Sequence, residues 1–211
     1  MKKRIKIVTW LGNGNFGTSL QSYALYHFLS IKGYDCSILS SFNYKHFSLK
    51  GYLKMILSAL GIMKFRERRK IKRVTDSKKL LKLRDFFRRN IRQEIISAPC
   101  QYRQLLHKTD VFCVGSDQVW NAYYNFSPFN FLDFAGNVKR ISYASSMGTN
   151  DFPERYKDTI KELLMKFAHI SLREATGREA VSRLTGRNDI KTVLDPTFLL
   201  NAEDWSSVAK Q

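Results

Sequence analysis

The stretch RIKIVTWLGNGNFGTSLQ, residues 4–21, decides the fold of this chain. It begins with a short β-branched and apolar run, Arg4 to Trp10, which predicts a buried first strand. Apolar residues then recur at helical spacing from Ser19 to Lys32, so a helix is predicted there, ended by Gly33. Strand, glycine turn and helix together favour an α/β fold that opens on a Rossmann-like unit. Between strand and helix stand three glycines in the spacing G-x-G-x-x-G: Gly12, Gly14 and Gly17.

This glycine spacing is also the fingerprint of dinucleotide-binding proteins, which need an acidic residue at the end of the second strand to hold the ribose hydroxyls. The second strand is predicted over Tyr34 to Ser40, and its only acid, Asp35, lies at its beginning. In addition, the side chain of Asn15 inside the turn would crowd a pyrophosphate. We therefore expect the glycines to permit a tight turn, with no NAD and no other cofactor bound.

The basic charge of the chain is concentrated in one segment. The 211 residues contain 36 Lys and Arg against 18 Asp and Glu, and residues 44–108 contribute +15 of the net charge of +18. Residues 49–63 are apolar with sparse lysines, residues 64–73 are mostly basic, and residues 77–92 predict an amphipathic basic helix. We expect a basic helical insertion at about 44–96 that contacts anionic lipid headgroups. A solvated helical hairpin packed on the core is the alternative.

Cysteines, histidines and apolar runs argue against several classes of protein. Three cysteines without C-x-x-C spacing, of which Cys36 and Cys113 lie in predicted strands, are typical of buried thiols in a reducing compartment. The four histidines are scattered, so no metal site is predicted. The apolar run at the N-terminus is too short for a signal peptide, and no run reaches the roughly 18 residues of a membrane span. We expect a cytoplasmic protein with peripheral contact at the inner face of the membrane.

The α/β alternation resumes near Ala98-Pro99. Strands that alternate with helices are typical of a parallel, doubly wound sheet with helices on both faces and right-handed crossovers. A chain of this length is long enough for one large α/β domain, predicted over residues 1–211. The further predicted strands are 110–114, 140–145, 168–172 and 191–194, and the further helices are 101–108, 153–167, 176–184 and a last one capped by Asn201.

Polar residues gather just after the predicted strands. In an open parallel sheet the carboxyl ends of the strands face one edge, which is the edge where ligands bind. Loops are polar in any case, and helix caps favour Ser, Asp and Asn, so part of this pattern is structural. The residues are Asn13 and Asn15, then Ser116, Asp117 and Gln118, then Ser145 and Ser146, then Arg173 and Glu174, and finally Asp195.

Five motifs in a fixed order resemble the polysaccharide pyruvyl transferase family. Each motif alone has little specificity, but their order covers nearly the whole chain apart from the basic segment. They are Asn15-Phe16-Gly17 with LQSYAL (20–25), GSDQVWN (115–121), SYASSMG (142–148), SLRE (171–174) with Gly177, and LDPT (194–197).

The resemblance implies a bacterial transferase of the cell envelope. Such an enzyme moves the enolpyruvyl unit of phosphoenolpyruvate onto a sugar of a capsule or exopolysaccharide, or of its lipid-linked precursor, and leaves a pyruvate ketal. Members of the family have two Rossmann-like halves, as in the GT-B architecture, and this chain corresponds to the first half. The donor pocket draws heavily on the second half, so we expect little transfer from these 211 residues alone.

The chemistry of ketal formation assigns roles to the residues at the predicted edge. Arg173 suits contact with the anionic donor, with an ion pair to Glu174 as the alternative. Asp117 is suited to bind a hydroxyl or to act as a general base, with capping of the following turn as the alternative. Trp120 either stacks on a sugar or belongs to the core. Asp117 and Arg173 are thus the catalytic candidates, and the substrate-binding candidates are Asn15, Gly17, Ser116, Gln118 and Glu174.

Two other functions stay open from the sequence. The chain could be a module related to GT-B glycosyltransferases, or a non-catalytic basic module that binds membrane or nucleic acid. Positive charge neutralises phosphates in either setting. Nucleic acid is not the expected partner, because the basic segment contains no nucleic-acid-binding motif.

Overall fold

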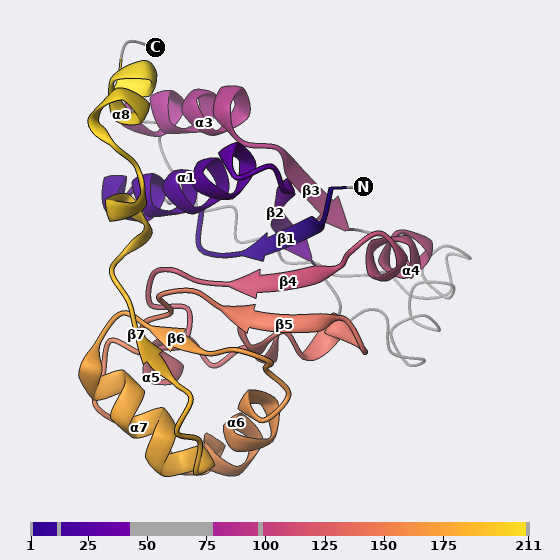
Figure 1. Ribbon diagram of the computed structural model, residues 1–211, viewed down its shortest axis with the longest axis vertical. Coiled ribbons are helices and arrows are strands. Elements are labelled where there is room, and N and C mark those ends of the chain that lie inside the picture. The colour runs from indigo at the N-terminus through magenta and orange to yellow at the C-terminus, as the bar shows by residue number, and fades with distance from the viewer. Residues whose placement is uncertain (1, 12–13, 43–77, 97–98, 210–211) are drawn as a thin grey trace, which may run out of the picture.

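The computed structural model describes residues 2–11, 14–42, 78–96 and 99–209, and a five-stranded parallel sheet forms its centre (Figure 1). The strand order is β3-β2-β1-β4-β5, and every neighbouring pair is parallel. This order confirms the predicted fold class, an α/β Rossmann-like parallel sheet. The direction of winding reverses between β1 and β4, which are therefore the strands of the switch point. The strands are β1 (Arg4–Val8), β2 (Asp35–Phe42), β3 (Gln93–Ile96), β4 (Val111–Val114) and β5 (Lys139–Ser142).

Helices cover both faces of this sheet because successive side chains of a strand point to opposite faces. Ile5 and Ile7 of β1 belong to one apolar cluster, whereas Val8 belongs to the other. The cluster that contains Ile5 and Ile7, called the first cluster below, packs under three helices that Figure 1 shows together on one side. They are α1 (Phe16–Ile31), α3 (Lys78–Asn90) and α8 (Ala202–Ala209). The other helices are α4 (Pro99–His107), α5 (Ala122–Asn125), α6 (Lys157–Leu164) and α7 (Ala175–Thr185), with short 3₁₀ turns η2 (Pro128–Phe131), η3 (Asp133–Ala135), η4 (Glu154–Tyr156) and η5 (Pro196–Leu199).

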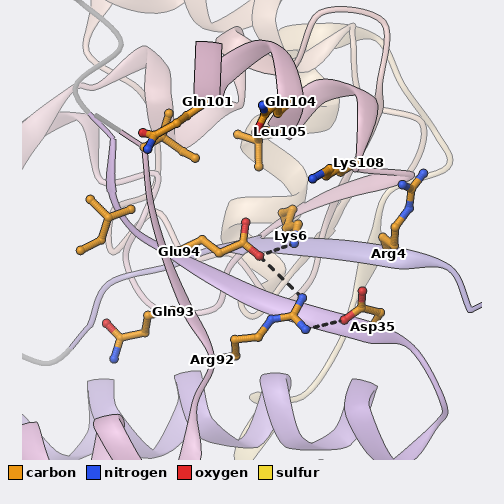
Figure 2. Close-up of a pocket in the computed structure, with 12 residues that line it drawn as sticks. Arg4, Lys6, Asp35, Arg92, Gln93, Glu94, Gln101, Gln104, Leu105 and Lys108 are labelled. Carbon is orange, nitrogen blue, oxygen red and sulfur yellow. Dashed lines mark hydrogen bonds and ion pairs between the residues drawn. The ribbon is translucent and has the colours of Figure 1, made fainter. Parts of the chain in front are cut away.

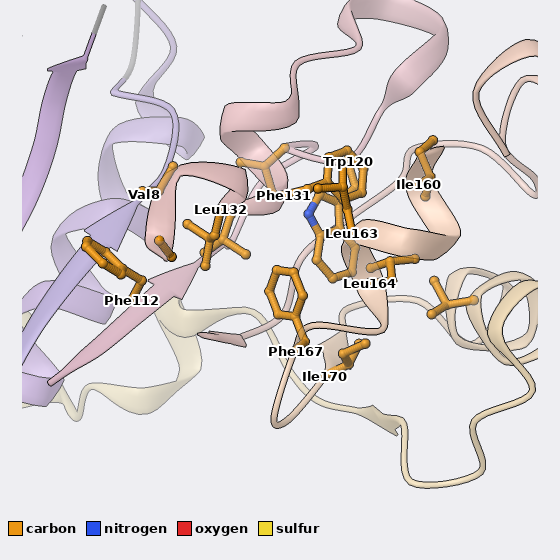
Figure 3. Packing of buried hydrophobic residues seen from close by; sticks show 14 of the residues in the cluster. Val8, Phe112, Trp120, Phe131, Leu132, Ile160, Leu163, Leu164, Phe167 and Ile170 are labelled. Carbon is orange, nitrogen blue, oxygen red and sulfur yellow. The ribbon is translucent and has the colours of Figure 1, made fainter. Parts of the chain in front are cut away.

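Trp120 lies at the centre of the second cluster (Figure 3). Its side chain is fully buried, and its ring stacks on Phe131 at a centroid distance of 5.5 Å. Phe167 meets the same ring edge to face, and the indole N–H donates to the carbonyl of Asn130. The core alternative is therefore the right one for Trp120, and this ring has no free face for a sugar.

The last two strands do not extend the main sheet, which differs from the predicted single sheet. β6 (Ser171–Leu172) and β7 (Lys191–Thr192) pair with each other. Only isolated bridges, such as the one between Ser145 and Leu172, connect β6 to the chain that follows β5. The side chains of Ser142 and Ser171 bond to each other's backbone and so replace a regular ladder: Ser171 N donates to Ser142 Oγ at 2.9 Å, and Ser171 Oγ donates to the Ser142 carbonyl at 2.9 Å.

Of the predicted basic insertion at about 44–96, residues 44–77 lie outside the described residues. The rest forms α3 and β3, and both elements belong to the layered fold. β3 pairs with β2 in parallel, while Phe87 and Ile91 are buried in the cluster under α3. β3 was not predicted from the sequence, because its four residues QEII alternate only briefly and follow a strongly basic helix.

A buried lysine connects three strands on the face of the sheet that α4 covers (Figure 2). The ammonium of Lys6 in β1 donates to Ser37 Oγ in β2 at 2.8 Å and to Glu94 Oε1 in β3 at 2.6 Å. Arg92 lies 2.8 Å from Asp35 and 3.6 Å from Glu94. These side chains line a polar cavity of about 670 Å³, and each of these charges has a partner within it.

Two thiols are buried, as predicted. Burial raises the pKa of Cys36 to about 11 and that of Cys113 to about 12, so both stay protonated at neutral pH. Among the helices in the described ranges, none combines the length and the apolarity that a bilayer crossing requires.

Candidate functional site

A polar cleft of about 730 Å³ lies at the switch point, beyond the carboxyl ends of β1 and β4. This is where open α/β sheets bind ligands. Residues from four segments form its wall, and they carry hydroxyl, amide, carboxylate and aromatic groups. They are Thr9, Trp10 and Leu11 after β1, Asn15 and Thr18 at the start of α1, Asp117 and Gln118 after β4, and Tyr124 and Asn125 in α5.

Asp117 lines this cleft and carries one unsatisfied carboxylate oxygen. Its backbone lies in the left-handed region, with φ of 64°. Oδ1 accepts a hydrogen bond of 2.8 Å from the backbone N–H of Gln118, so the capping alternative holds for this oxygen. Oδ2 is buried and has no hydrogen-bond partner among the described residues. A buried, unpartnered oxygen of this kind costs free energy in the ligand-free protein.

Gln118 is fixed beside Asp117 by its surroundings. Its Oε1 accepts a hydrogen bond of 3.0 Å from Asn121 Nδ2. Gly148 packs directly against the Gln118 amide: a Cβ at position 148 would lie 2.7 Å from Gln118 Cδ. The Gln118 side chain is therefore held in one orientation at the cleft wall.

Asn15 and Gly17 lie at the first turn of α1, and both are exposed. Asn15 is the N-cap, and its Oδ1 accepts a hydrogen bond of 3.3 Å from the N–H of Thr18. A Cβ at Gly17 would lie 3.3 Å from that same Oδ1. The small residue at position 17 thus leaves room for the cap, and Asn15 keeps its amide nitrogen for other contacts.

Ser116 is fully buried and connects the switch point to α1. Its backbone N–H donates to Gln21 Oε1 at 3.2 Å, and Gln21 Nε2 in turn donates to Thr9 Oγ1 at 3.1 Å and to the carbonyl of Thr18 at 2.9 Å. Gln21 therefore ties the ends of β1 and β4 to the same turn of helix. Ser116 has a supporting position here, behind the cleft wall.

Arg173 lies in a charged cluster next to Ser116. Its NH1 donates to Asp195 Oδ2 at 3.0 Å, and its Nε donates to Glu174 Oε1 at 3.2 Å. Burial alone would lower the pKa of Arg173, but these hydrogen bonds outweigh it and raise the pKa. Asp195 also lies 3.3 Å from Ser116 Oγ and accepts from Thr197. The structure therefore contains the ion pair between Arg173 and Glu174 that was predicted from the sequence as the alternative role of Arg173.

Glu174, like Asp117, has one carboxylate oxygen without a hydrogen-bond partner among the described residues. It occupies the N-cap position of α7, but its side chain makes no cap hydrogen bond. Oε1 is taken by Arg173, while Oε2 is buried without a partner among the described residues. The cluster therefore holds two carboxylates, Glu174 and Asp195, against one guanidinium.

The structure brings the predicted residues together in two neighbouring groups. Asn15, Asp117 and Gln118 line the cleft, while Arg173 and Glu174 lie in the charged cluster and are not among the described residues that line the cleft. Ser116 joins the two groups through Asp195. The sequence analysis assigned no role to four further residues. They are Gln21, Trp10, Tyr124 and Asp195; Gln21 and Asp195 belong to the motifs LQSYAL and LDPT, whereas Trp10 and Tyr124 carried no signal.

No group of three or more His, Cys, Asp and Glu among the described residues is placed to hold a metal ion. Asp35 begins β2 and pairs with Arg92, remote from the turn after β1. The prediction that this turn does not bind NAD stays a prediction, because Gly12 and Asn13 lie outside the described residues.

Comparison with known proteins identifies a family and a similar fold. A family model described as polysaccharide pyruvyl transferase matches residues 15–211. Among solved structures, the chain is similar to the apo-structure of D-lactate dehydrogenase from Escherichia coli, with 12% sequence identity and a TM-score of 0.34. That similarity covers 99% of this chain and 48% of the dehydrogenase chain, so this chain spans about half of its length. No curated protein matches the chain.

Proposed function

The chain belongs to the polysaccharide pyruvyl transferase family, and from this membership we propose that it acts in the transfer of a pyruvyl group from phosphoenolpyruvate to a sugar. The sugar is part of a cell-surface polysaccharide or of its lipid-linked precursor. The switch-point cleft is proposed to hold the sugar acceptor.

The proposed reaction forms two C–O bonds at C2 of the enolpyruvyl unit, from two hydroxyls of one sugar, and breaks the C–O bond to phosphate. One hydroxyl proton is transferred to the methylene carbon, which becomes a methyl group, and the other leaves with phosphate. The site must therefore accept protons from hydroxyls and stabilise a cationic C2. A carboxylate beside the acceptor hydroxyls meets both requirements.

The unpartnered Oδ2 of Asp117 is the observation that carries this proposal. Its partner would be an acceptor hydroxyl, since a hydroxyl donates readily to a carboxylate. Gln118 and Asn15 add amide groups along the same wall. The negative charge of Asp117 favours a neutral polyol over an anionic group as its direct hydrogen-bond partner.

Two aromatic rings support a sugar site. Trp10 and Tyr124 both line the cleft, with ring centroids 6.1 Å apart and planes inclined by 55°. Tyr124 is 79% exposed, so its ring is accessible to a ligand in the cleft. Amphipathic rings offer an apolar face to the C–H side of a sugar while the polar groups bind its hydroxyls.

Arg173 is proposed to contact the anionic donor from the neighbouring cluster. Two of its five N–H donors are used by Glu174 and Asp195, so three remain. The two carboxylates reduce its net attraction for an anion, but they also fix the guanidinium in one orientation. Arg173→Ala is expected to weaken the use of phosphoenolpyruvate by about 10- to 150-fold, and Lys at this position to restore only part of the loss.

The test is an assay of acceptor-dependent phosphate release from phosphoenolpyruvate, with the ketal detected by NMR, on the protein as its gene encodes it. Asp117→Asn is expected to lower kcat by about 100-fold or more if Asp117 is the base. If Asp117 only binds a hydroxyl, the KM for the acceptor rises instead.

Asp158→Asn is the matched control, because it makes the same chemical change on the exposed face of α6. The control should transfer at the parent's rate. Equal rates for Asp117→Asn and the parent would contradict the assignment of the cleft. An absence of any ketal from a folded parent, with a range of sugar acceptors, would contradict the proposed reaction.

A further inference from the structure

An apolar slot of about 520 Å³ lies between α1 and α3, next to the proposed acceptor cleft. Phe16 and Leu20 lie four residues apart on α1, so they share one face of the helix. The same turn presents Asn15 and Thr18 to the cleft on an adjacent face. The slot is lined by Phe16, Ser19 and Leu20 of α1, by Lys82, Leu83, Asp85, Phe86, Arg89 and Asn90 of α3, and by Ala209 of α8.

The floor of this slot is apolar and partly open to solvent. Phe16 is 56% exposed and Leu20 is 38% exposed, whereas Leu83 is buried beneath them. Large apolar side chains that gather in a concave site mark a place where an apolar ligand or partner binds.

The rim of the slot is positively charged. Lys82 and Arg89 line it, both are exposed, and neither has an ion pair among the described residues. The one acid in the slot, Asp85, lies 3.6 Å from Arg88 and so has its charge offset. Lys82 and Arg89 stand seven residues apart, about 10 Å along the helix, and can flank one group from two sides. The occupant must therefore be apolar and carry a negative charge.

We propose that this slot binds the hydrocarbon chain of a lipid phosphate, with Lys82 and Arg89 on the phosphate. This inference rests on the proposed function, because it makes the lipid-linked precursor the acceptor. A sugar attached to that phosphate would lie next to the cleft, since Asn15 of the cleft and Phe16 of the slot are neighbours in the chain. The phosphate would contact the two cations, and the hydrocarbon chain would be buried against the apolar floor. This arrangement explains why apolar and basic side chains share one slot.

The test is calorimetric titration of the protein with dodecyl phosphate below its micelle concentration. Dodecyl phosphate is expected to bind saturably, dodecyl maltoside at least about tenfold more weakly because it lacks the charge, and inorganic phosphate not measurably because it lacks the chain. Equal binding of dodecyl phosphate and dodecyl maltoside would overturn the role of the two cations.

Two variants with matched controls locate the site. Leu20→Ser removes apolar contact from the slot and should weaken dodecyl phosphate binding about tenfold, while Leu81→Ser, at an exposed α3 leucine outside the slot lining, should not. Arg89→Gln should weaken binding about fivefold, and Arg103→Gln, at an exposed arginine of α4 outside the lining, should not. A melting temperature within the parent's range shows that each variant is folded.

Each result separates this inference from the proposed reaction. Transfer activity without dodecyl phosphate binding overturns the slot alone, and dodecyl phosphate binding by a protein that never transfers overturns the reaction alone. If Leu20→Ser instead dissociates a dimer in sedimentation, the slot is an interface between two copies and the lipid assignment is wrong.

Discussion

At the scale of single residues, the role proposed for Asp117 conflicts with the stability of the ligand-free protein. Its Oδ1 has a partner and its Oδ2 has none among the described residues. A buried, unpartnered oxygen costs free energy in the ligand-free protein, and such sites persist where function requires them.

We predict that Asp117→Asn stabilises the protein against urea by about 1 kcal/mol while it impairs transfer, because it removes a partly buried charge. Asn also tolerates the left-handed backbone that this position has. Urea unfolding followed by circular dichroism measures the change, with Asp158→Asn as the neutral control. A lower stability of Asp117→Asn would mean that Oδ2 has a donor in the ligand-free state.

Gly115 gives a second prediction at this scale. It has φ of 117°, and a Cβ there would lie 2.2 Å from the Tyr143 carbonyl oxygen, so β4 and the chain after β5 approach each other through this glycine. Gly115→Ala should cost at least about 3 kcal/mol, by overpacking against a backbone atom. Gly33→Ala should cost only about 1 kcal/mol, because it shares a positive φ but meets open space. Similar losses for both variants in urea unfolding would contradict the close approach.

The sequence predicted the placement of some site residues and not of others. Asn15, Asp117 and Gln118 follow β1 and β4, and neighbouring parallel strands bring them to one edge. Arg173 depends on a more remote contact. Its partner Asp195 comes 22 residues later, beyond α7 and β7, and no local pattern encodes which carboxylate the guanidinium meets.

At the scale of elements, the Lys6–Glu94 pair joins β1 to β3 across β2 (Figure 2). Burial alone would raise the pKa of Glu94, but hydrogen bonds from Lys6 and Ser37 outweigh it and lower the pKa below the ordinary value of 4.5. Because the pKa is lower in the folded state, this group stabilises the fold above about pH 4.5. The stabilisation is lost as the pH falls through the lower, folded value.

We predict that Glu94→Gln destabilises the protein at pH 6 by about 2 kcal/mol, less than for a fully buried pair because a third of the Glu94 side chain is exposed. At pH 3 the variant and the parent should differ less, since the parent has then lost part of this contribution. Urea unfolding at the two pH values measures this, with Glu162→Gln on exposed α6 as control. An equal loss of stability at pH 6 and pH 3 would contradict a lowered pKa of Glu94 in the folded state.

The sequence predicted the longer elements well and the shortest ones poorly. β1, α1 and α7 carry clear periodicity and end signals, and their observed bounds lie close to the predicted ones. β3 has only four residues, and β6 and β7 pair over two residues each. Strands were predicted at 168–172 and 191–194, where β6 and β7 form, but with longer bounds, whereas β3 was not predicted. Elements this short are stabilised by their neighbours, as by the serine contacts between β5 and β6, so local sequence does not fix their extent.

At the scale of the whole molecule, the alternation of strands and helices was sufficient to predict a Rossmann-like parallel sheet covered on both faces. The distribution of charge adds a property that the fold alone does not explain. In α3, six basic residues accompany one acid, and the exposed members face solvent beside the apolar slot.

We predict that the protein binds anionic vesicles and that binding weakens as salt rises from about 0.1 to 1 M, because the Debye length falls from about 10 to 3 Å. Cosedimentation with vesicles of phosphatidylglycerol and of phosphatidylcholine measures this. Deletion of residues 49–73, which lie outside the described residues, should remove the salt-sensitive part of the binding. Equal binding to both lipids, at every salt concentration, would contradict the prediction.

Gln21 gives the cleft a further property. One amide in α1 accepts from Ser116 after β4 and donates to Thr9 after β1, so a single side chain spans the two strand ends that flank the cleft. Opening the cleft there would break both contacts at once and expose buried polar groups. The cleft is consequently held in shape along this side, so a ligand that binds there as proposed would meet an existing shape, and little ordering entropy would be lost on binding.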